Sequence, residues 1–142
     1  MTPPPQTLEH RFVGYVPEEL EERTLYVSMD YATVVHSCCC GCGGRVVTPL
    51  SPTDWKLTFD GRSVTLTPSV NNSGFECESH YFIVDSRVAW ASRLLPHQLA
   101  ATRRRDLQAK DAYYEGDHSD QAPVERSRPK KVWSWLAKLL SR

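Results

Sequence analysis

The sequence HSCCCGCGG, residues 36–44, holds four of the five cysteines in the chain. Neighbouring cysteines rarely reach the Cα separation and the Cβ directions that a disulfide requires, so thiols this crowded are poorly suited to pairing with one another. A borderline-soft ion such as Zn²⁺ takes four cysteine or histidine ligands tetrahedrally, and adjacent glycines let the backbone curl so that the sulfurs converge. The stretch therefore predicts a metal-binding turn, which we call the knuckle.

A fourth ligand is expected from Cys77, which lies far downstream of the knuckle. Two sets of knuckle ligands fit the spacing equally well: the Cys-x-x-Cys-Gly motif that begins at Cys39, and Cys38, Cys40 and Cys42 at alternate positions. Reduced, partly buried thiols without a metal are the structural alternative. A redox-active Cys-x-x-Cys is disfavoured, because the surrounding sequence lacks the βαβ pattern of a thioredoxin.

The length of 142 residues and the hydrophobic content of 40% suit one modest domain with a single small core. The formal net charge is zero, so no global field favours nucleic acid as a partner. Neither a signal peptide nor an apolar run long enough to cross a bilayer is evident. Crowded cysteines suit a reducing compartment better than a secreted disulfide framework, and we expect a cytoplasmic protein.

Changes in composition along the chain predict five segments. Prolines near the start indicate a disordered lead-in, alternating β-branched and aromatic residues indicate strands, and good helix formers dominate after Pro96. The segments are a disordered lead-in (1–10), a β domain with the zinc site and the candidate active site (11–95), a helix (96–115), a linker (116–129) and a basic amphipathic helix (130–142).

The expected β domain contains eight strands, at residues 11–16, 24–28, 33–36, 45–50, 55–59, 62–67, 77–84 and 87–91. Asp60-Gly61 and Asp85-Ser86 each separate two alternating runs and predict hairpins, with a tight primed turn at Asp60-Gly61. The acidic residues 18–22 follow a proline and predict a short helical turn. The predicted fold is mainly β: a small antiparallel domain with a zinc-ribbon-like knuckle, followed by C-terminal helices.

Two histidines are candidates for chemistry. His80 follows the proposed ligand Cys77 by three residues and is the natural general base, although from the sequence alone a zinc ligand or a structural histidine explains it better than catalysis does. His36 adjoins the cysteines and is more plausible as a ligand. Asp54 is one carboxylate that could orient an imidazole, whereas the other candidates, Asp60 and Asp85, are explained by turns.

Three serines are candidates for a nucleophile. Ser79 adjoins His80, but neighbouring residues on a strand point to opposite faces, which argues against a direct hydrogen bond between them. Ser51 precedes Pro52 and is typical of a turn or a helix cap. Ser69 follows Pro68 beside an Asn/Gly-rich loop, where a hydroxyl can be exposed on a fixed scaffold, so Ser69 is the preferred candidate.

Four blocks of this sequence, in order, resemble a bacterial domain family of unknown function found in operons for ubiquitin-like conjugation of the Bub type, and the activity that this resemblance implies is that of a serine protease. The blocks are residues 36–43, 48–55, 66–70 and 77–83, and the resemblance spans about residues 12–91. The chain departs from the family pattern in two places. Cys39 stands where a proline is common, and residues 71–74 (NNSG) replace a usual Gly-Asn-Trp segment.

The resemblance implies a Ser-His dyad with Ser69 as nucleophile and His80 as general base. It also implies a structural Zn²⁺ held by four cysteines: Cys38, Cys40, Cys42 and Cys77. With this assignment, His36 and Cys39 are the alternative ligands and Ser51 is the alternative nucleophile. Backbone N–H groups in the loop after Ser69 would stabilise the oxyanion.

The resemblance further implies a ubiquitin-like protein as substrate, either matured at its C-terminus or removed from a target, in a pathway with E1-like and E2-like partners and a role in antiphage defence. A non-catalytic zinc-binding interaction module in the same pathway is the alternative. Nucleic-acid binding through the basic clusters is the weakest hypothesis. The helix at 130–142 suits a partner's groove, its own domain or an anionic membrane surface, with membrane contact the less favoured.

Overall fold

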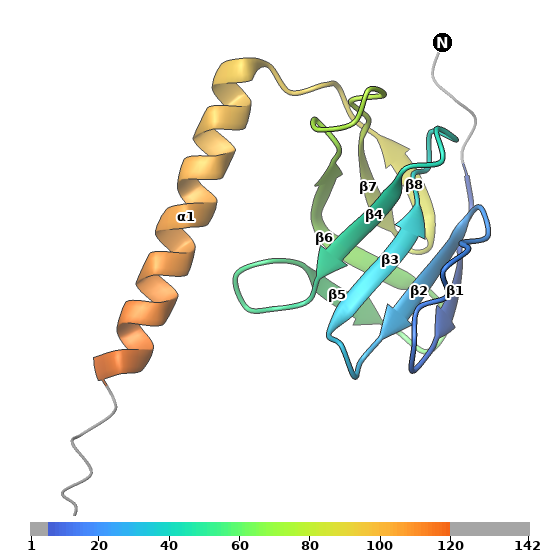
Figure 1. Cartoon of the computed structure of the whole chain (residues 1–142), viewed down its shortest axis with the longest axis horizontal. Helices are drawn as coiled ribbons and strands as arrows, with labels where there is room; N and C mark the ends of the chain where they lie inside the picture. Colours follow the sequence, from blue (N-terminus) through green and yellow to red (C-terminus); the bar gives the residue numbers. More distant parts are fainter. Residues whose placement is uncertain (1–5, 120–142) are drawn as a thin grey trace, which may run out of the picture. The chain divides into compact units, whose positions relative to one another are not determined.

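The computed structural model describes residues 6–119, with side chains through residue 116 (Figure 1). The elements in this part of the chain are β1 (Glu9–Phe12), β2 (Thr24–Ser28), β3 (Thr33–Ser37), β4 (Arg45–Pro49), β5 (Lys56–Phe59), β6 (Val64–Asn71), β7 (His80–Val84), β8 (Arg87–Trp90) and α1 (Pro96–Ser119). By its contacts the chain divides into two units, Met1–Lys110 and Asp111–Arg142, and every site discussed below lies within the first.

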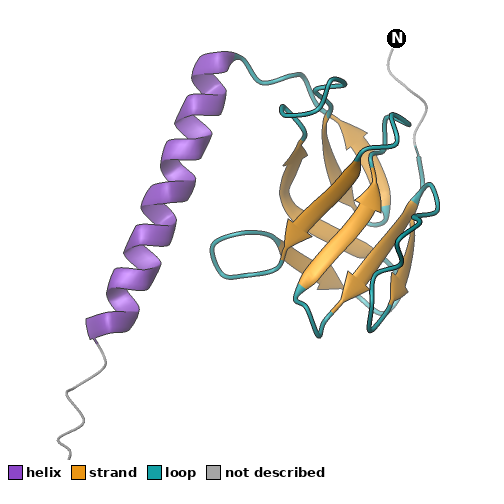
Figure 2. Cartoon of the chain, viewed as in Figure 1, coloured by secondary structure: helices purple, strands orange, loops and turns teal. Residues whose placement is uncertain are grey.

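The strands, orange in Figure 2, form two four-stranded sheets, whose strand orders are β1-β2-β3-β4 and β5-β6-β7-β8. Only the pairing of β1 with β2 is parallel, and the other five pairings are antiparallel. The prediction of a mainly β, largely antiparallel fold is therefore confirmed. The knuckle connects β3 to β4 at one end of the first sheet.

One hydrophobic core joins the two sheets. Fully buried aliphatic side chains come from both, and the largest are Leu25, Val27 and Val34 from the first sheet and Val64, Leu66, Val70 and Ile83 from the second. Each such side chain contributes about 1.5–3 kcal/mol relative to leaving it in water. The packing of these two inner faces against each other stabilises the short strands of both sheets.

The expected disorder of residues 1–10 is wrong for residues 6–10. Thr7 forms a bridge to Arg87 in the second sheet, and the Leu8 N–H donates to the Ser86 carbonyl at 2.7 Å. Two residues on, β1 runs parallel to β2 in the first sheet. The prolines, residues 3–5, precede this segment and do not prevent it from pairing. The Leu8 side chain is only 3% exposed and packs in the core between the two sheets.

The helical turn expected at residues 18–22 does not form. Glu21 instead makes a two-pronged ion pair with Arg11, with both N···O distances at 2.8 Å. The carbonyls of Pro17 and Glu18 accept hydrogen bonds from the Arg45 guanidinium. These tertiary contacts hold the acidic segment as a loop, because charge-assisted bonds outweigh the weak preference of a short acidic run for helix.

Both predicted hairpins form. In the first, Phe59 pairs with Val64, so the tight turn predicted at Asp60-Gly61 is wrong: the loop has four residues and is closed by Asp60, whose Oδ1 accepts the Ser63 N–H at 2.6 Å. In the second, Val84 pairs with Arg87, and both intervening residues have positive φ, as a two-residue primed turn requires.

Two strand boundaries differ from the prediction in ways that affect the site. β6 does not end at Pro68 but continues through Ser69 to Asn71, and β7 begins at His80 rather than at Cys77. The register between β6 and β7 shifts between Leu66 and Val70, which identifies a bulge there. Proline has no N–H to donate and is tolerated inside a sheet at such a bulge, so Pro68 marked an irregularity rather than an end.

The helix predicted at residues 96–115 forms as α1 and continues to Ser119, so the first residues of the expected linker are helical. Pro96 occupies its first position, and Gln98 Oε1 accepts the Leu95 N–H at 2.8 Å, which caps the start of the helix. Between residues 6 and 119 no helix is both long and apolar enough to span a membrane. The helix predicted at residues 130–142 lies outside the described residues.

Truncating Leu8 should test whether the N-terminal segment is part of the fold. We expect Leu8→Ala to lower the free energy of unfolding by about 2–5 kcal/mol, because it leaves a cavity between the two sheets. Leu95→Ala, at a leucine that is 55% exposed, is the matched control and should change stability little. Urea titrations of both variants measure the difference, and equal midpoints would show that residues 6–8 contribute nothing to the core.

Candidate active site and cysteine cluster

Ser69 lies within the bulge of β6, and His80 is the first residue of β7, the neighbouring strand. Val70 points into the core, so Ser69 and Asn71, on either side of it, share the opposite face of the strand. His80 is paired with Asn71 and lies on that same face. A bulge re-aims side chains locally, which brings the Ser69 hydroxyl toward the imidazole.

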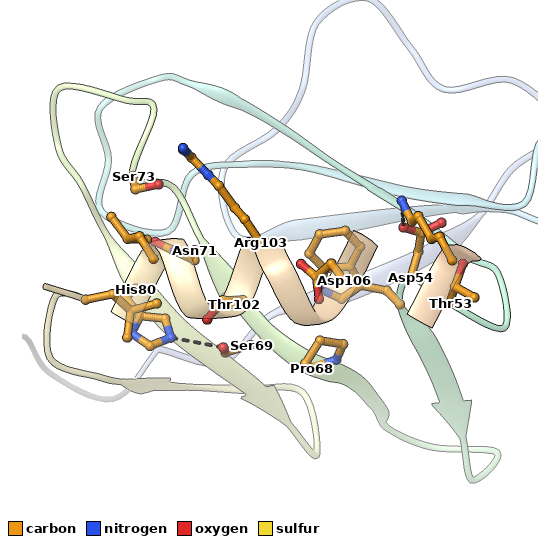
Figure 3. A pocket seen from close by; sticks show the side chains of 14 residues that line it. Thr53, Asp54, Pro68, Ser69, Asn71, Ser73, His80, Thr102, Arg103 and Asp106 are labelled. Carbon is orange, nitrogen blue, oxygen red and sulfur yellow. Dashed lines mark hydrogen bonds and ion pairs between the residues drawn. The ribbon is translucent and has the colours of Figure 1, made fainter. Parts of the chain in front are cut away.

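The Ser69 hydroxyl and the His80 imidazole are hydrogen-bonded, with Oγ and Nε2 2.9 Å apart (Figure 3). The other ring nitrogen, Nδ1, is 2.7 Å from the backbone carbonyl oxygen of Ser92. A carbonyl can only accept, so Nδ1 of a neutral imidazole must hold the proton and Nε2 must be the acceptor. The serine O–H therefore donates to an imidazole whose tautomer is fixed by the main chain.

The segment after β8 is fastened to the strand that bears His80. The Ala91 N–H donates to the His80 carbonyl at 2.9 Å, and Arg93 pairs with Glu78 at 3.0 Å while also donating to the Cys77 carbonyl. Ser92 lies between these two attachments. Sequence reasoning missed Ser92 because it contributes a main-chain carbonyl, which no residue type reveals.

None of the aspartates considered earlier orients His80. Asp60 closes the first hairpin and Asp85 lies in the second, as expected from the sequence. Asp54 accepts a hydrogen bond from the Ser51 hydroxyl at 2.7 Å and forms an ion pair with Lys110 at 2.8 Å. Ser51 is thus a turn residue bonded to a carboxylate, in keeping with its expected structural role.

Ser69 and His80 line a cavity of about 430 Å³. Its apolar lining comes from Trp55, Pro68, Leu94 and Leu99, and its polar lining includes Asn71, Ser73, Asp54, Thr102, Arg103, Asp106 and Lys110. The volume lies within the range of about 300–1,000 Å³ that is usual for ligand sites. Concave, mixed lining around a hydrogen-bonded hydroxyl and imidazole is suited to nucleophilic attack on a bound carbonyl.

The sulfurs of Cys38, Cys40, Cys42 and Cys77 gather into a second site, all within 4.8 Å of one another. The separations are 3.4 Å for Cys38–Cys40, 3.9 Å for Cys38–Cys77 and 3.7 Å for Cys42–Cys77. Four sulfurs around a tetrahedral ion, each about 2.3 Å from it, would lie about 3.8 Å apart. All five cysteines are free thiols, so this cluster could hold a metal ion.

The acidity of the thiols fits the same interpretation. Burial raises the pKa of Cys77, but hydrogen bonds with Ser79 and with neighbouring thiols outweigh it and lower that pKa to about 7. Burial raises the pKa of Cys40 in turn, and the neighbouring Cys38 thiol adds to the effect. Without a cation, repulsion between neighbouring thiolates allows only one of the four thiols to deprotonate. A bound cation compensates the negative charges and lets all four deprotonate.

His36 and Cys39, the alternative ligands, are not members of the cluster. His36 is 1% exposed, and its Nε2 is 2.8 Å from the Tyr81 hydroxyl. Burial lowers the pKa of His36 to about 4, so it is a neutral core residue. Cys39 is buried in the hydrophobic core, and burial raises its thiol pKa to about 12. Neither spacing nor composition revealed this, because Cys39 stands between two members of the cluster and His36 is only two residues from Cys38.

Ser79 contacts the cysteine cluster and is not part of the serine–histidine pair. Its hydroxyl is 3.1 Å from the Cys38 sulfur and 3.0 Å from the side-chain nitrogen of Asn72. His80, the next residue, points to the opposite face, as expected from strand alternation. Two consecutive residues therefore contact the two sites, one on each side of the chain.

A model of the BubE family, described as a bacterial ubiquitination-like system serine protease, matches residues 12–91. The chain belongs to the BubE family. The match covers more than half of the sequence and contains both the serine–histidine pair and all five cysteines. A comparison with curated proteins and another with solved structures returned no match. The resemblance noted in the sequence is confirmed, and this BubE chain extends past the matched region into α1.

Metal content should distinguish the four cysteines of the cluster from Cys39, which lies in the core. Native mass spectrometry of the purified BubE chain should show about one bound ion per protein, and Cys77→Ser should lose it because three sulfurs cannot complete a tetrahedral site. Cys39→Ala, at the buried thiol outside the cluster, is the control and should retain the ion. A folded wild-type protein without metal, or loss of metal in Cys39→Ala alone, would contradict the assignment.

Proposed function

We propose that this chain is a dyad protease in which Ser69 is the nucleophile and His80 the general base, acting at the C-terminus of a ubiquitin-like protein. The observation that supports this most directly is the pair of hydrogen bonds to His80, 2.9 Å to the Ser69 hydroxyl and 2.7 Å to the Ser92 carbonyl. Membership of a serine protease family of a bacterial ubiquitination-like system supplies the reaction class and the pathway.

In the proposed reaction, His80 Nε2 takes the Ser69 proton as the hydroxyl oxygen attacks the scissile carbonyl. The imidazolium that forms is stabilised by its Nδ1–H bond to the Ser92 carbonyl. The same Nε2 then gives its proton to the leaving amine, and water repeats the sequence to release the acyl group. A main-chain carbonyl in this proposal takes the place that a carboxylate holds in a triad.

The oxyanion needs hydrogen-bond donors, and we assign one of them to Asn71. In the loop after β6, the N–H groups of Asn72, Phe75 and Glu78 already donate to backbone carbonyls. Asn71 shares the strand face of Ser69 and lines the cavity, and its side-chain amide has no hydrogen-bond partner within residues 6–116. Side-chain amides serve as oxyanion donors in other acyl-transfer enzymes.

For the cysteine cluster we propose a structural Zn²⁺ with Cys38, Cys40, Cys42 and Cys77 as ligands. Three ligands come from the knuckle of the first sheet and one from the loop before β7 in the second. An ion held there would fasten the two sheets together beside His80. Free thiols on all five cysteines fit a reducing compartment, and we propose the cytoplasm.

The substrate we propose is the cognate ubiquitin-like protein, matured from a precursor or released from a target, with E1-like and E2-like proteins as pathway partners. A cavity of about 430 Å³ has room for a short peptide segment but not for a folded domain. A flexible C-terminal tail meets that requirement.

Replacing the nucleophile should abolish cleavage. Wild-type protein incubated with the cognate ubiquitin-like precursor should release a shorter product, and Ser69→Ala should release none. Ser63→Ala, in the hairpin turn between β5 and β6, is the matched serine control and should cleave normally. Mass spectrometry should also map a fluorophosphonate adduct to Ser69. An adduct on Ser51 would assign the nucleophile elsewhere, and an uncleaved precursor with wild-type protein would favour a non-catalytic zinc module.

Replacing the base should slow the chemical step and leave binding almost unchanged. We expect His80→Gln to lower kcat by about 10²–10⁴ with little change in KM, because glutamine cannot accept the serine proton. His10→Gln is the control, since His10 contacts the rings of Phe12 and Phe59 and does not line the cavity. Steady-state kinetics on the precursor measures both, and a kcat near the wild-type value in His80→Gln would exclude His80 as the base.

A further inference from the structure

The cavity beside Ser69 is bounded on one side by α1, whose lining residues share one helical face. These residues are Leu99, Thr102, Arg103, Asp106 and Lys110. Relative to the first, they fall three, four, seven and eleven positions along the chain, which is the spacing of a single stripe on an α-helix. Figure 3 shows Thr102, Arg103 and Asp106 on the helix beside the strand that bears Ser69.

This face of α1 is not built to bury itself in a core. A helix that packs for stability presents a broad apolar stripe, whereas Leu99 is the one apolar residue among the five. The side chains of Arg103 and Asp106 form no ion pair or hydrogen bond with another residue in the described part of the chain. Both charges therefore stay available to groups that enter the cavity.

One ion pair joins this face to the β domain. Lys110 Nζ is 2.8 Å from Asp54 Oδ1, and Asp54 Oδ2 accepts the Ser51 hydroxyl at 2.7 Å. The two side chains are 41% and 23% exposed, and an ion pair exposed to that degree contributes only about 0–1 kcal/mol. A contact this weak can open to admit a ligand and close again over it.

We propose that this face of α1 is a substrate-binding wall, which holds the extended C-terminal segment of a protein substrate against β6 with the Lys110–Asp54 pair as its closing contact. The substrate's identity rests on the proposed function. Leu99 and Leu94 supply apolar contact, and Arg103 and Asp106 supply one charge of each sign for the polar groups of the peptide. The wall lies outside the family match, residues 12–91, so it is a feature of this chain beyond the region that the family model covers.

A binding experiment tests the wall without relying on catalysis. The full chain with Ser69→Ala is titrated with a synthetic peptide of the C-terminal segment of the cognate ubiquitin-like protein, and binding is followed by calorimetry. Adding Leu99→Ala or Lys110→Asp should weaken Kd by about tenfold, a difference of about 1.4 kcal/mol. Exchanging the charges, Asp54→Lys with Lys110→Asp, should recover most of the affinity lost in the single variant.

Two matched variants on the same helix serve as controls. Leu107→Ala removes a leucine that is 63% exposed and does not line the cavity, and Arg104→Asp reverses a charge that also lies off the wall. Both should bind the peptide as tightly as the Ser69→Ala parent. Equal affinity in all helix variants, or no binding of the peptide by the parent, would overturn the proposal.

Cleavage by the protein with Ser69 intact separates this inference from the proposed function. If the wall is correct, Leu99→Ala and Lys110→Asp raise KM for the precursor while fluorophosphonate labels Ser69 at the wild-type rate. If wild type does not cleave but the helix variants still weaken peptide binding, the protease assignment fails and the wall stands. If wild type cleaves and every helix variant keeps the wild-type Kd and KM, the wall fails alone.

Discussion

The antiparallel pairing of β6 with β7 is the interaction on which the rest of the site depends. It aligns Asn71 with His80, and the bulge just before it brings Ser69 within 2.9 Å of the imidazole. Strand alternation then places Tyr81 in the core and Ser79 against the cysteine cluster, on the face opposite His80. A shift of one residue in this register would exchange those faces and separate the serine from the histidine.

The loop between these strands couples the pairing to the cysteine cluster. Cys77 lies in that loop, and so does Asn72, whose side-chain nitrogen donates to the Ser79 hydroxyl and lies 3.5 Å from the Cys38 sulfur. Buried polar groups that satisfy one another in this way hold a single arrangement, because an unpaired group in the interior costs about 1–3 kcal/mol. An ion bound by the four sulfurs would therefore help to fix the position of the start of β7, where His80 is located.

Much of the fold and part of the site followed from the sequence, for identifiable reasons. Asp60-Gly61 and the alternating runs around it specify their hairpin locally, so that prediction needed no tertiary information. Pro68 was wrongly taken to end its strand, since proline in a paired strand indicates a bulge as readily as an end. Leu8 and the acidic residues 18–22 were mispredicted because contacts to distant residues, Ser86 and Arg45 among them, decide their conformations.

Ser92 is the part of the site that no residue pattern could reveal, and its role has an electrostatic consequence. A carboxylate beside an imidazole stabilises the imidazolium by a full charge, whereas a carbonyl offers only a dipole. The hydrogen bond to Ser92 therefore fixes the tautomer of His80 but stabilises its charged form less. In the proposed mechanism, more of the rate acceleration must then come from holding the scissile bond in position. The cavity, which α1 bounds on one side, is suited to that task.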